Sequence, residues 1–102
     1  MLLNNISYEI KTDIRARTTN NIFIEFIQNS KLSGISTTEA EFYIIIIPYV
    51  KLPLFILIEV LELQFLISTM QYKFILHPNI TNKYTGAYTF TLETIIKNSQ
   101  FI

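Results

Sequence analysis

One hundred and two residues fit one domain, because a domain usually has about 100 to 200 residues. We therefore expect residues 1–102 to form a single domain. Half of the residues are hydrophobic and 16% are charged, a balance that excludes a disordered chain. The eight basic and eight acidic residues exclude a polyanion binder that works through bulk positive charge. With no cysteine and one histidine, the chain lacks disulfides, thiolate nucleophiles and zinc-finger ligands, which leaves carboxylates as candidate metal ligands.

Residues 42–68 are strongly apolar but do not have the pattern of a membrane span. Lys51, Glu59 and Glu62 divide this segment, and no uncharged apolar run reaches the roughly 18 residues that a spanning helix needs. The first residues also lack the basic start and long apolar core of a secretory signal. We therefore expect a cytoplasmic protein that makes no contact with a membrane.

Residues 7–13 alternate as a half-buried strand does, with Glu9, Lys11 and Asp13 on one side. A polar connection over residues 14–20 then leads to a second strand over residues 21–28, which is rich in β-branched and aromatic side chains. This succession predicts a hairpin with a long, basic loop.

The later part of the chain adds a capping-box spacing from Ser36 to Glu39 and two apolar runs of strand length, the first typical of a central strand covered on both faces. The expected elements are a short helix over residues 36–41, strands over 42–49 and 52–58, a helix over 60–69, a turn at 77–79, a strand over 84–91 and a helix over 92–98 with Ile95 and Ile96 inward. This order predicts an α/β fold with one mixed central β-sheet flanked by short helices.

The E-x-K pattern of Glu9 and Lys11 has a possible chemical use. Alternation points both side chains into the same space, where a carboxylate can hold Mg²⁺ while the ammonium orients water and offsets charge on a phosphate. The other interpretation is a solvated strand face that carries an ordinary charge pair.

Several short runs together resemble a known group of proteins. They are Y-E-I-K-T-D at residues 8–13, T-N-N-I-F-I-E at 19–25, S-G-I at 33–35, T-T-E-A at 37–40 and G-A-Y at 86–88. In this order they resemble phage-encoded nuclease-like proteins of the PD-(D/E)XK superfamily, which have a restriction-endonuclease-like fold. The resemblance extends from about residue 7 to residue 98.

The resemblance implies roles for particular residues. It makes Glu9 a metal-binding carboxylate and Lys11 the catalytic lysine. Glu25 matches the acidic residue of the adjacent strand and Asp13 the acid that follows the lysine, so either could lie near a Mg²⁺ or Mn²⁺ ion.

Arg15 and Arg17 stand in the connection between the two expected strands. They are candidates for contacts to DNA phosphates, and exposed solubilising charges are the alternative.

The chain departs from the superfamily pattern at its start. The first acidic residue of the family normally lies on the strand before the E-x-K strand, and residues 1–8 contain no Asp or Glu. The N-terminal helix and first strand of the family also have no counterpart, so we expect an N-terminally truncated member in which Asp13 or Glu25 compensates. Apolar surface exposed by this loss would favour a homo-oligomer.

The resulting expectation is a Mg²⁺-dependent DNA endonuclease-like domain from a phage-infected cell or an AT-rich bacterium, since 19 isoleucines and eight asparagines match AT-rich codons. One alternative is an inactive remnant of the same fold that binds DNA or a protein. Another is a small structural protein in which the E-x-K pattern is accidental.

Overall fold

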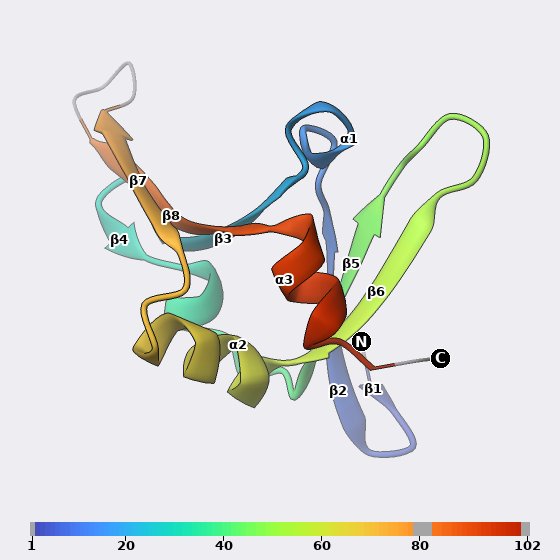
Figure 1. The fold of residues 1–102 in the computed structure, drawn as a ribbon. Coiled ribbons are helices and arrows are strands. Elements are labelled where there is room, and N and C mark those ends of the chain that lie inside the picture. Colours follow the sequence, from blue (N-terminus) through green and yellow to red (C-terminus); the bar gives the residue numbers. More distant parts are fainter. Residues whose placement is uncertain (1, 79–82, 101–102) are drawn as a thin grey trace.

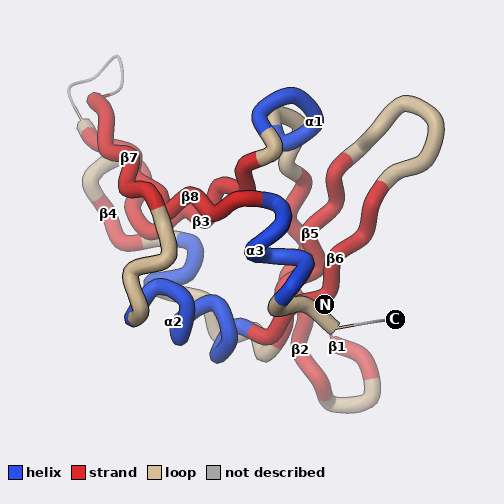
Figure 2. The backbone as a smooth tube through the Cα atoms, in the orientation of Figure 1, coloured by secondary structure: helices blue, strands red, loops and turns tan. Residues whose placement is uncertain are grey.

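The computed structural model describes residues 2–78 and 83–100, whose strands form two four-stranded sheets (Figures 1 and 2). The first sheet has the order β1 (Leu2–Leu3), β2 (Ile6–Thr12), β5 (Phe42–Ile47) and β6 (Leu54–Glu59). The second has the order β4 (Lys31–Leu32), β3 (Asn21–Gln28), β8 (Tyr84–Thr91) and β7 (Lys73–Pro78). The helices of this part are α1 (Ala16–Thr19), the 3-10 helix η1 (Gly34–Ser36), α2 (Val60–Ser68) and α3 (Leu92–Lys97). The expected α/β class is confirmed. The expectation of one central sheet was wrong, because the strands form two separate sheets.

The first sheet is mixed. β2 pairs with β5 in parallel, and β6 pairs with β5 in the antiparallel direction. A parallel pair needs a long crossover, and the segment from α1 to η1 provides it. β3 belongs to this crossover and pairs with β4 and β8 in the other sheet. The expected hairpin between residues 7–13 and 21–28 was therefore wrong.

The chain changes sheets at α1 because of local hydrogen bonds. Asp13 Oδ1 accepts a 3.1 Å hydrogen bond from the N–H of Ala16, which supports the first turn of the helix. Asn20 ends the helix in a left-handed conformation, with φ 57°, that asparagine tolerates better than most residues. The chain then enters β3 in a new direction.

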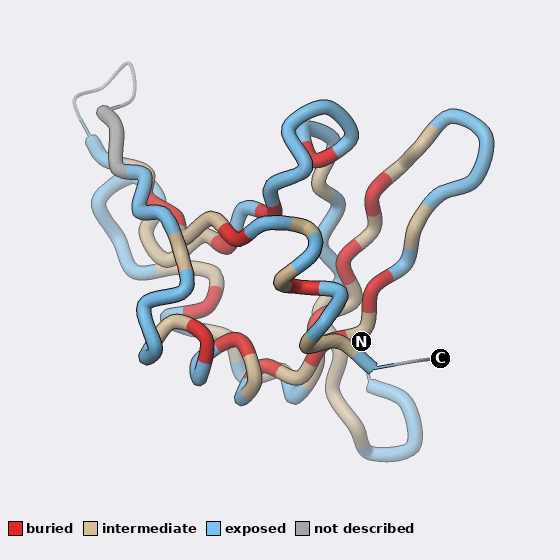
Figure 3. Tube along the Cα trace, in the orientation of Figure 1, coloured by how far each residue is buried: buried red, intermediate tan, exposed pale blue. Residues whose placement is uncertain are grey.

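The core lies on the side of the first sheet that faces the second sheet and the helices. Every second residue of β5 is buried (Figure 3). β5 is central in its sheet, as predicted, but it is not fully covered on both faces, because Phe42, Ile44 and Ile46 remain partly exposed. The larger fully buried side chains are Tyr43, Phe90, Ile22, Ile45, Ile47, Ile58, Leu63, Leu66 and Ile95.

The second half of the chain follows its sequence pattern more closely. α2, β8 and α3 are confirmed with shifts of about one residue at their ends. Within α3, Ile95 is buried as expected, whereas Ile96 is 46% exposed. Of the expected turn at 77–79, the first two residues continue β7 and the third lies outside the described residues.

The expected helix over residues 36–41 was wrong. The helical turn is η1, which begins two residues earlier at Gly34. Beyond it, the side chain of Thr38 accepts a hydrogen bond from the N–H of Ala40, and this local bond replaces the helical pattern.

In the described part of the chain, no helix has the length and apolar character needed to cross a membrane.

Candidate functional site

Glu9 and Lys11 lie next to each other on the inner face of β2, as the alternation predicts. Lys11 Nζ is 2.7 Å from Glu9 Oε2. Their neighbours on β5 are Tyr43 and Ile45, which are both buried. Lys11 Nζ also lies 5.9 Å from the centre of the Tyr43 ring, within the range of a cation–π contact. The side chains of Glu9 and Lys11 keep 33% and 44% of their surface exposed, so the pair forms a site that solvent can reach.

A hydroxyl group from the loop before β5 completes the contacts of Glu9. Thr38 Oγ1 donates a 2.9 Å hydrogen bond to Glu9 Oε1. Partial burial acts to raise the pKa of Glu9, but the hydrogen bonds from Lys11 and Thr38 and the charge of Lys11 outweigh it, so the pKa is lowered from its usual value of 4.5. Glu9 is therefore a carboxylate at neutral pH.

The Tyr43 hydroxyl is a buried polar group with an unmet hydrogen bond. Tyr43 is 2% exposed, and its hydroxyl oxygen has no hydrogen-bond partner within the part of the chain that the structure describes. Burial raises its pKa to about 12. The charges of Glu9 and Glu25 also raise this pKa, whereas the neighbouring Thr38 hydroxyl lowers it. The hydroxyl thus stays protonated at neutral pH.

Glu25 lies on β3 in the second sheet, near enough to Tyr43 for its charge to act on that pKa. The Ser33 hydroxyl donates a 3.0 Å hydrogen bond to Glu25 Oε2. Gly34 adopts a left-handed conformation with φ 53°, and any side chain there would overlap the carbonyl oxygen of Glu25. The register of β3 against β8 shifts just after Glu25. Such an irregularity changes the direction in which the neighbouring side chains point and is common next to active sites.

Asp13 has a different environment from Glu9. Its Oδ1 accepts from the Ala16 N–H, and its Oδ2 accepts a 2.9 Å hydrogen bond from the N–H of Phe23 in β3. Both carboxylate oxygens therefore bind backbone groups at the junction between the two sheets. The structure thus places Asp13 as a support for this junction.

Arg15 and Arg17 flank the start of α1 and are exposed. Arg17 Nε donates a 3.2 Å hydrogen bond to the carbonyl of Ile14. α1 follows the end of β2 at one end of the molecule (Figure 1), and both arginines are exposed to solvent.

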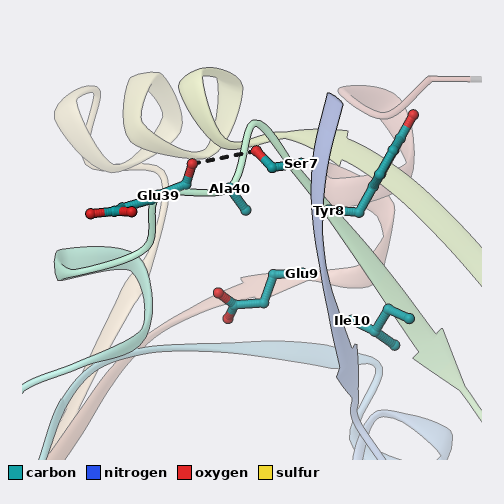
Figure 4. A pocket seen from close by; sticks show the side chains of 6 residues that line it. All are labelled: Ser7, Tyr8, Glu9, Ile10, Glu39 and Ala40. Atoms are coloured by element: carbon teal, nitrogen blue, oxygen red, sulfur yellow. Dashed lines mark hydrogen bonds between the residues drawn. The ribbon is translucent and has the colours of Figure 1, made fainter. Parts of the chain in front are cut away.

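An open pocket adjoins Glu9 on β2. In Figure 4 the Glu9 side chain points toward the loop of Glu39 and Ala40, whereas Tyr8 and Ile10 point to the opposite side of the strand. The carbonyl of Glu39 accepts a 3.4 Å hydrogen bond from Ser7, and the Glu39 carboxylate points away from Glu9 (Figure 4).

Residues 2–78 and 83–100 contain no group of three acidic, histidine or cysteine side chains that could together hold a metal ion. The structure thus joins Glu9 to Lys11, places Glu25 on the second sheet where its charge acts on Tyr43, and keeps Asp13 at the sheet junction.

Sequence patterns did not indicate Thr38 and Tyr43 as members of the site. Thr38 belongs to the T-T-E-A run, which the sequence assigns to a helix start, and Tyr43 stands in an apolar run that indicates core packing. Their position beside Glu9 depends on the parallel pairing of β2 and β5, which local patterns do not specify.

Comparisons of the chain with protein-family models, with curated proteins and with solved structures found no match.

Proposed function

We propose that this chain is a Mg²⁺-dependent nuclease-like domain of the PD-(D/E)XK type that hydrolyses phosphodiester bonds in DNA. The observation that carries the proposal is the pair of Glu9 and Lys11, two residues apart on β2 and 2.7 Å apart in a partly open site. The proposal includes a restriction-endonuclease-like fold. The mixed sheet with the E-x-K strand beside the parallel strand β5 supports it.

The donor set of the site fits Mg²⁺, which binds one or two carboxylates and keeps several waters. Glu9 would hold the ion, and Glu25, whose charge acts on Tyr43 from the neighbouring sheet, would be the second carboxylate. A bound Mg²⁺ would polarise a phosphate oxygen and lower the pKa of a water molecule.

The side chains of the chain itself have further roles in this proposal. Lys11 would orient the attacking water and offset the charge that grows on the phosphate. The buried Tyr43 ring would support Lys11 from below through its cation–π contact and would keep a neutral hydroxyl beneath the site. Arg15 and Arg17 would contact the phosphates of the flanking DNA, in the cytoplasm of a bacterial or phage-infected cell.

The test is cleavage of supercoiled, linear and branched DNA by the purified chain with Mg²⁺ or Mn²⁺. We expect metal-dependent cleavage that Glu9→Gln and Lys11→Met each reduce at least about 100-fold, since such groups typically contribute factors of 10² to 10⁴. Lys51→Met and Glu93→Gln are the matched controls, because Lys51 is exposed in the loop between β5 and β6 and Glu93 is exposed on α3. Cleavage that persists in both site variants, or that needs no metal, would contradict the proposal.

An inactive domain that binds DNA is the second candidate. It is favoured by the contacts of Glu9, whose two oxygens already accept from Lys11 and Thr38. This candidate predicts salt-dependent DNA binding without cleavage, and fluorescence anisotropy with labelled DNA would distinguish it from the enzyme.

A further inference from the structure

The Lys11 ammonium occupies the position of a cation at the Glu9 carboxylate. Its Nζ atom lies 2.7 Å from Glu9 Oε2, which is the length of a short charge-assisted hydrogen bond. The other oxygen, Oε1, accepts a 2.9 Å hydrogen bond from the Thr38 hydroxyl. Each oxygen of the Glu9 carboxylate therefore already has a donor from the chain itself.

A divalent ion on Glu9 and the Lys11 ammonium in its present place would repel each other. Mg²⁺ binds a carboxylate oxygen at about 2.1 Å. An ion on Oε2 would be at most about 4.8 Å from Lys11 Nζ, because the ammonium is itself 2.7 Å from this oxygen. At that separation, the repulsion between a double and a single positive charge is equivalent to a factor of about 10 or more in affinity.

The surroundings of the pair allow the ammonium to move. Lys11 Nζ lies 5.9 Å from the centre of the Tyr43 ring, whose face attracts a cation. The Lys11 side chain is also partly exposed, so solvent can hydrate the ammonium. The pocket beside Glu9 has a volume of about 480 Å³, many times the roughly 30 Å³ of a water molecule, so a hydrated ion can enter it.

We propose that the Lys11 ammonium competes with the metal ion for Glu9 and thereby sets the order of binding. Lys11 pairs with Glu9 in the metal-free chain, where it prevents a partly buried carboxylate from lacking a partner. It leaves Oε2 when a divalent ion binds, and only then is the ammonium available to a phosphate oxygen. The inference rests on the proposed function, because it takes Glu9 as the metal ligand and Lys11 as the group that meets the phosphate.

A purely supporting role for Lys11 predicts the opposite change in metal affinity. If the ion pair only held Glu9 in the right direction for a metal ion, its removal would weaken metal binding. Competition requires that removal of the ammonium strengthens metal binding while it reduces cleavage. The sign of the change in affinity therefore separates the two roles.

Mn²⁺ binding to the full chain, measured by the EPR signal of the free ion, tests the proposal. Lys11→Met should bind Mn²⁺ about 10-fold more tightly than the wild-type chain. Lys11→Arg keeps the positive charge and should bind no more tightly than the wild-type chain. Lys31→Met, at an exposed position on β4, is the matched control and should leave the affinity unchanged. Glu9→Gln should lose this binding, whereas Glu93→Gln on α3 should keep it.

Chemical labelling of the wild-type chain covers the case in which a Lys11 variant fails to fold. Acetylation with acetic anhydride, followed at each lysine by mass spectrometry, should become faster at Lys11 when Mn²⁺ is added, because Glu9 no longer holds the amine. Lys31 is the internal control in the same sample, and its rate should stay constant.

The results distinguish this inference from the proposed function. Weaker or unchanged Mn²⁺ binding by a folded Lys11→Met variant would overturn the inference even if the wild-type chain cleaves DNA. Equal labelling of Lys11 with and without Mn²⁺ would overturn it as well. Tighter binding by Lys11→Met, with no cleavage by the wild-type chain, would support the inference and contradict the nuclease function. A wild-type chain that binds no Mn²⁺ would overturn both.

Discussion

The hydroxyl of Thr38 and the carboxylate of Glu9 form a 2.9 Å hydrogen bond between residues 29 positions apart in the sequence. Thr38 lies in the loop that returns from the second sheet to β5, and Glu9 lies in the first sheet. The bond therefore connects the orientation of the proposed metal ligand to the crossover that makes β2 and β5 parallel.

Thr38→Val should raise the pKa of Glu9, because it removes one of the two side-chain hydrogen bonds that lower it. Carbon-13 NMR titration of the Glu9 carboxyl measures this change, and Thr37→Val on the exposed neighbour is the control. Since the pKa of Glu9 is lower in the folded state, its ion pair stabilises the fold above about pH 4.5, and that contribution disappears as the pH falls through the folded pKa. An unchanged Glu9 titration in Thr38→Val would contradict the role given to this hydroxyl.

Tyr43→Phe should leave the fold equally stable or stabilise it by about 1 kcal/mol, because a buried hydroxyl without a partner costs free energy. Tyr43→Ala should instead destabilise the fold by about 3–5 kcal/mol, since it leaves a cavity in the core. Urea denaturation of both variants provides the comparison. A loss above about 1 kcal/mol in Tyr43→Phe would show that the hydroxyl is hydrogen-bonded in solution.

Asp13→Ala should destabilise the fold by about 2 kcal/mol, because the N–H groups of Ala16 and Phe23 both lose a charged acceptor. Asp13→Asn keeps one acceptor oxygen and should lose about half as much. Thermal denaturation at pH 7 measures the difference. A stable Asp13→Ala variant that loses metal affinity would assign Asp13 to the metal site instead of the sheet junction.

Gly34→Ala should destabilise the fold by about 2–4 kcal/mol, since it adds a methyl group against the Glu25 carbonyl at a left-handed position. Thr37→Ala, also beside η1, is the control and should cost less than about 1 kcal/mol. Chemical denaturation of both variants tests the prediction. Equal stability of the two variants would show that η1 can move away from β3 without cost.

Replacing Arg15 and Arg17 together by glutamine should weaken DNA binding and reduce its salt dependence. If each arginine contacts one phosphate, the slope of log K against log salt should fall in magnitude by about 2. Fluorescence anisotropy at several salt concentrations measures the slope. Lys31→Gln with Lys97→Gln, on exposed positions elsewhere, controls for total charge.

The sequence predicts the elements of this fold better than their pairing. β8, α2 and α3 follow from alternation and helical spacing, which are local properties of the chain. The assignment of β2 and β3 to different sheets depends on Asp13, whose two oxygens bind groups three and ten residues away. Sequence spacing does not show which backbone groups a carboxylate will bind.

The same distinction between local pattern and long-range pairing applies to the candidate site. The contact between Glu9 and Lys11 follows from alternation along one strand, so the sequence alone predicts it. The approach of Tyr43 and Thr38 depends on the register of β2 with β5, which is fixed by the packing of distant segments. Alternation also did not specify which side of β2 faces inward, and the side with Ile10 is the one that faces out.

Glu9 and Glu25 belong to different sheets, Glu9 to β2 of the first sheet and Glu25 to β3 of the second. An ion bound by both carboxylates would therefore link the two sheets. The distance between the two carboxylates would then depend on the spacing between the sheets. In this arrangement, core substitutions far from both residues would change metal affinity through that spacing, and metal binding would in turn tighten the packing of the whole domain.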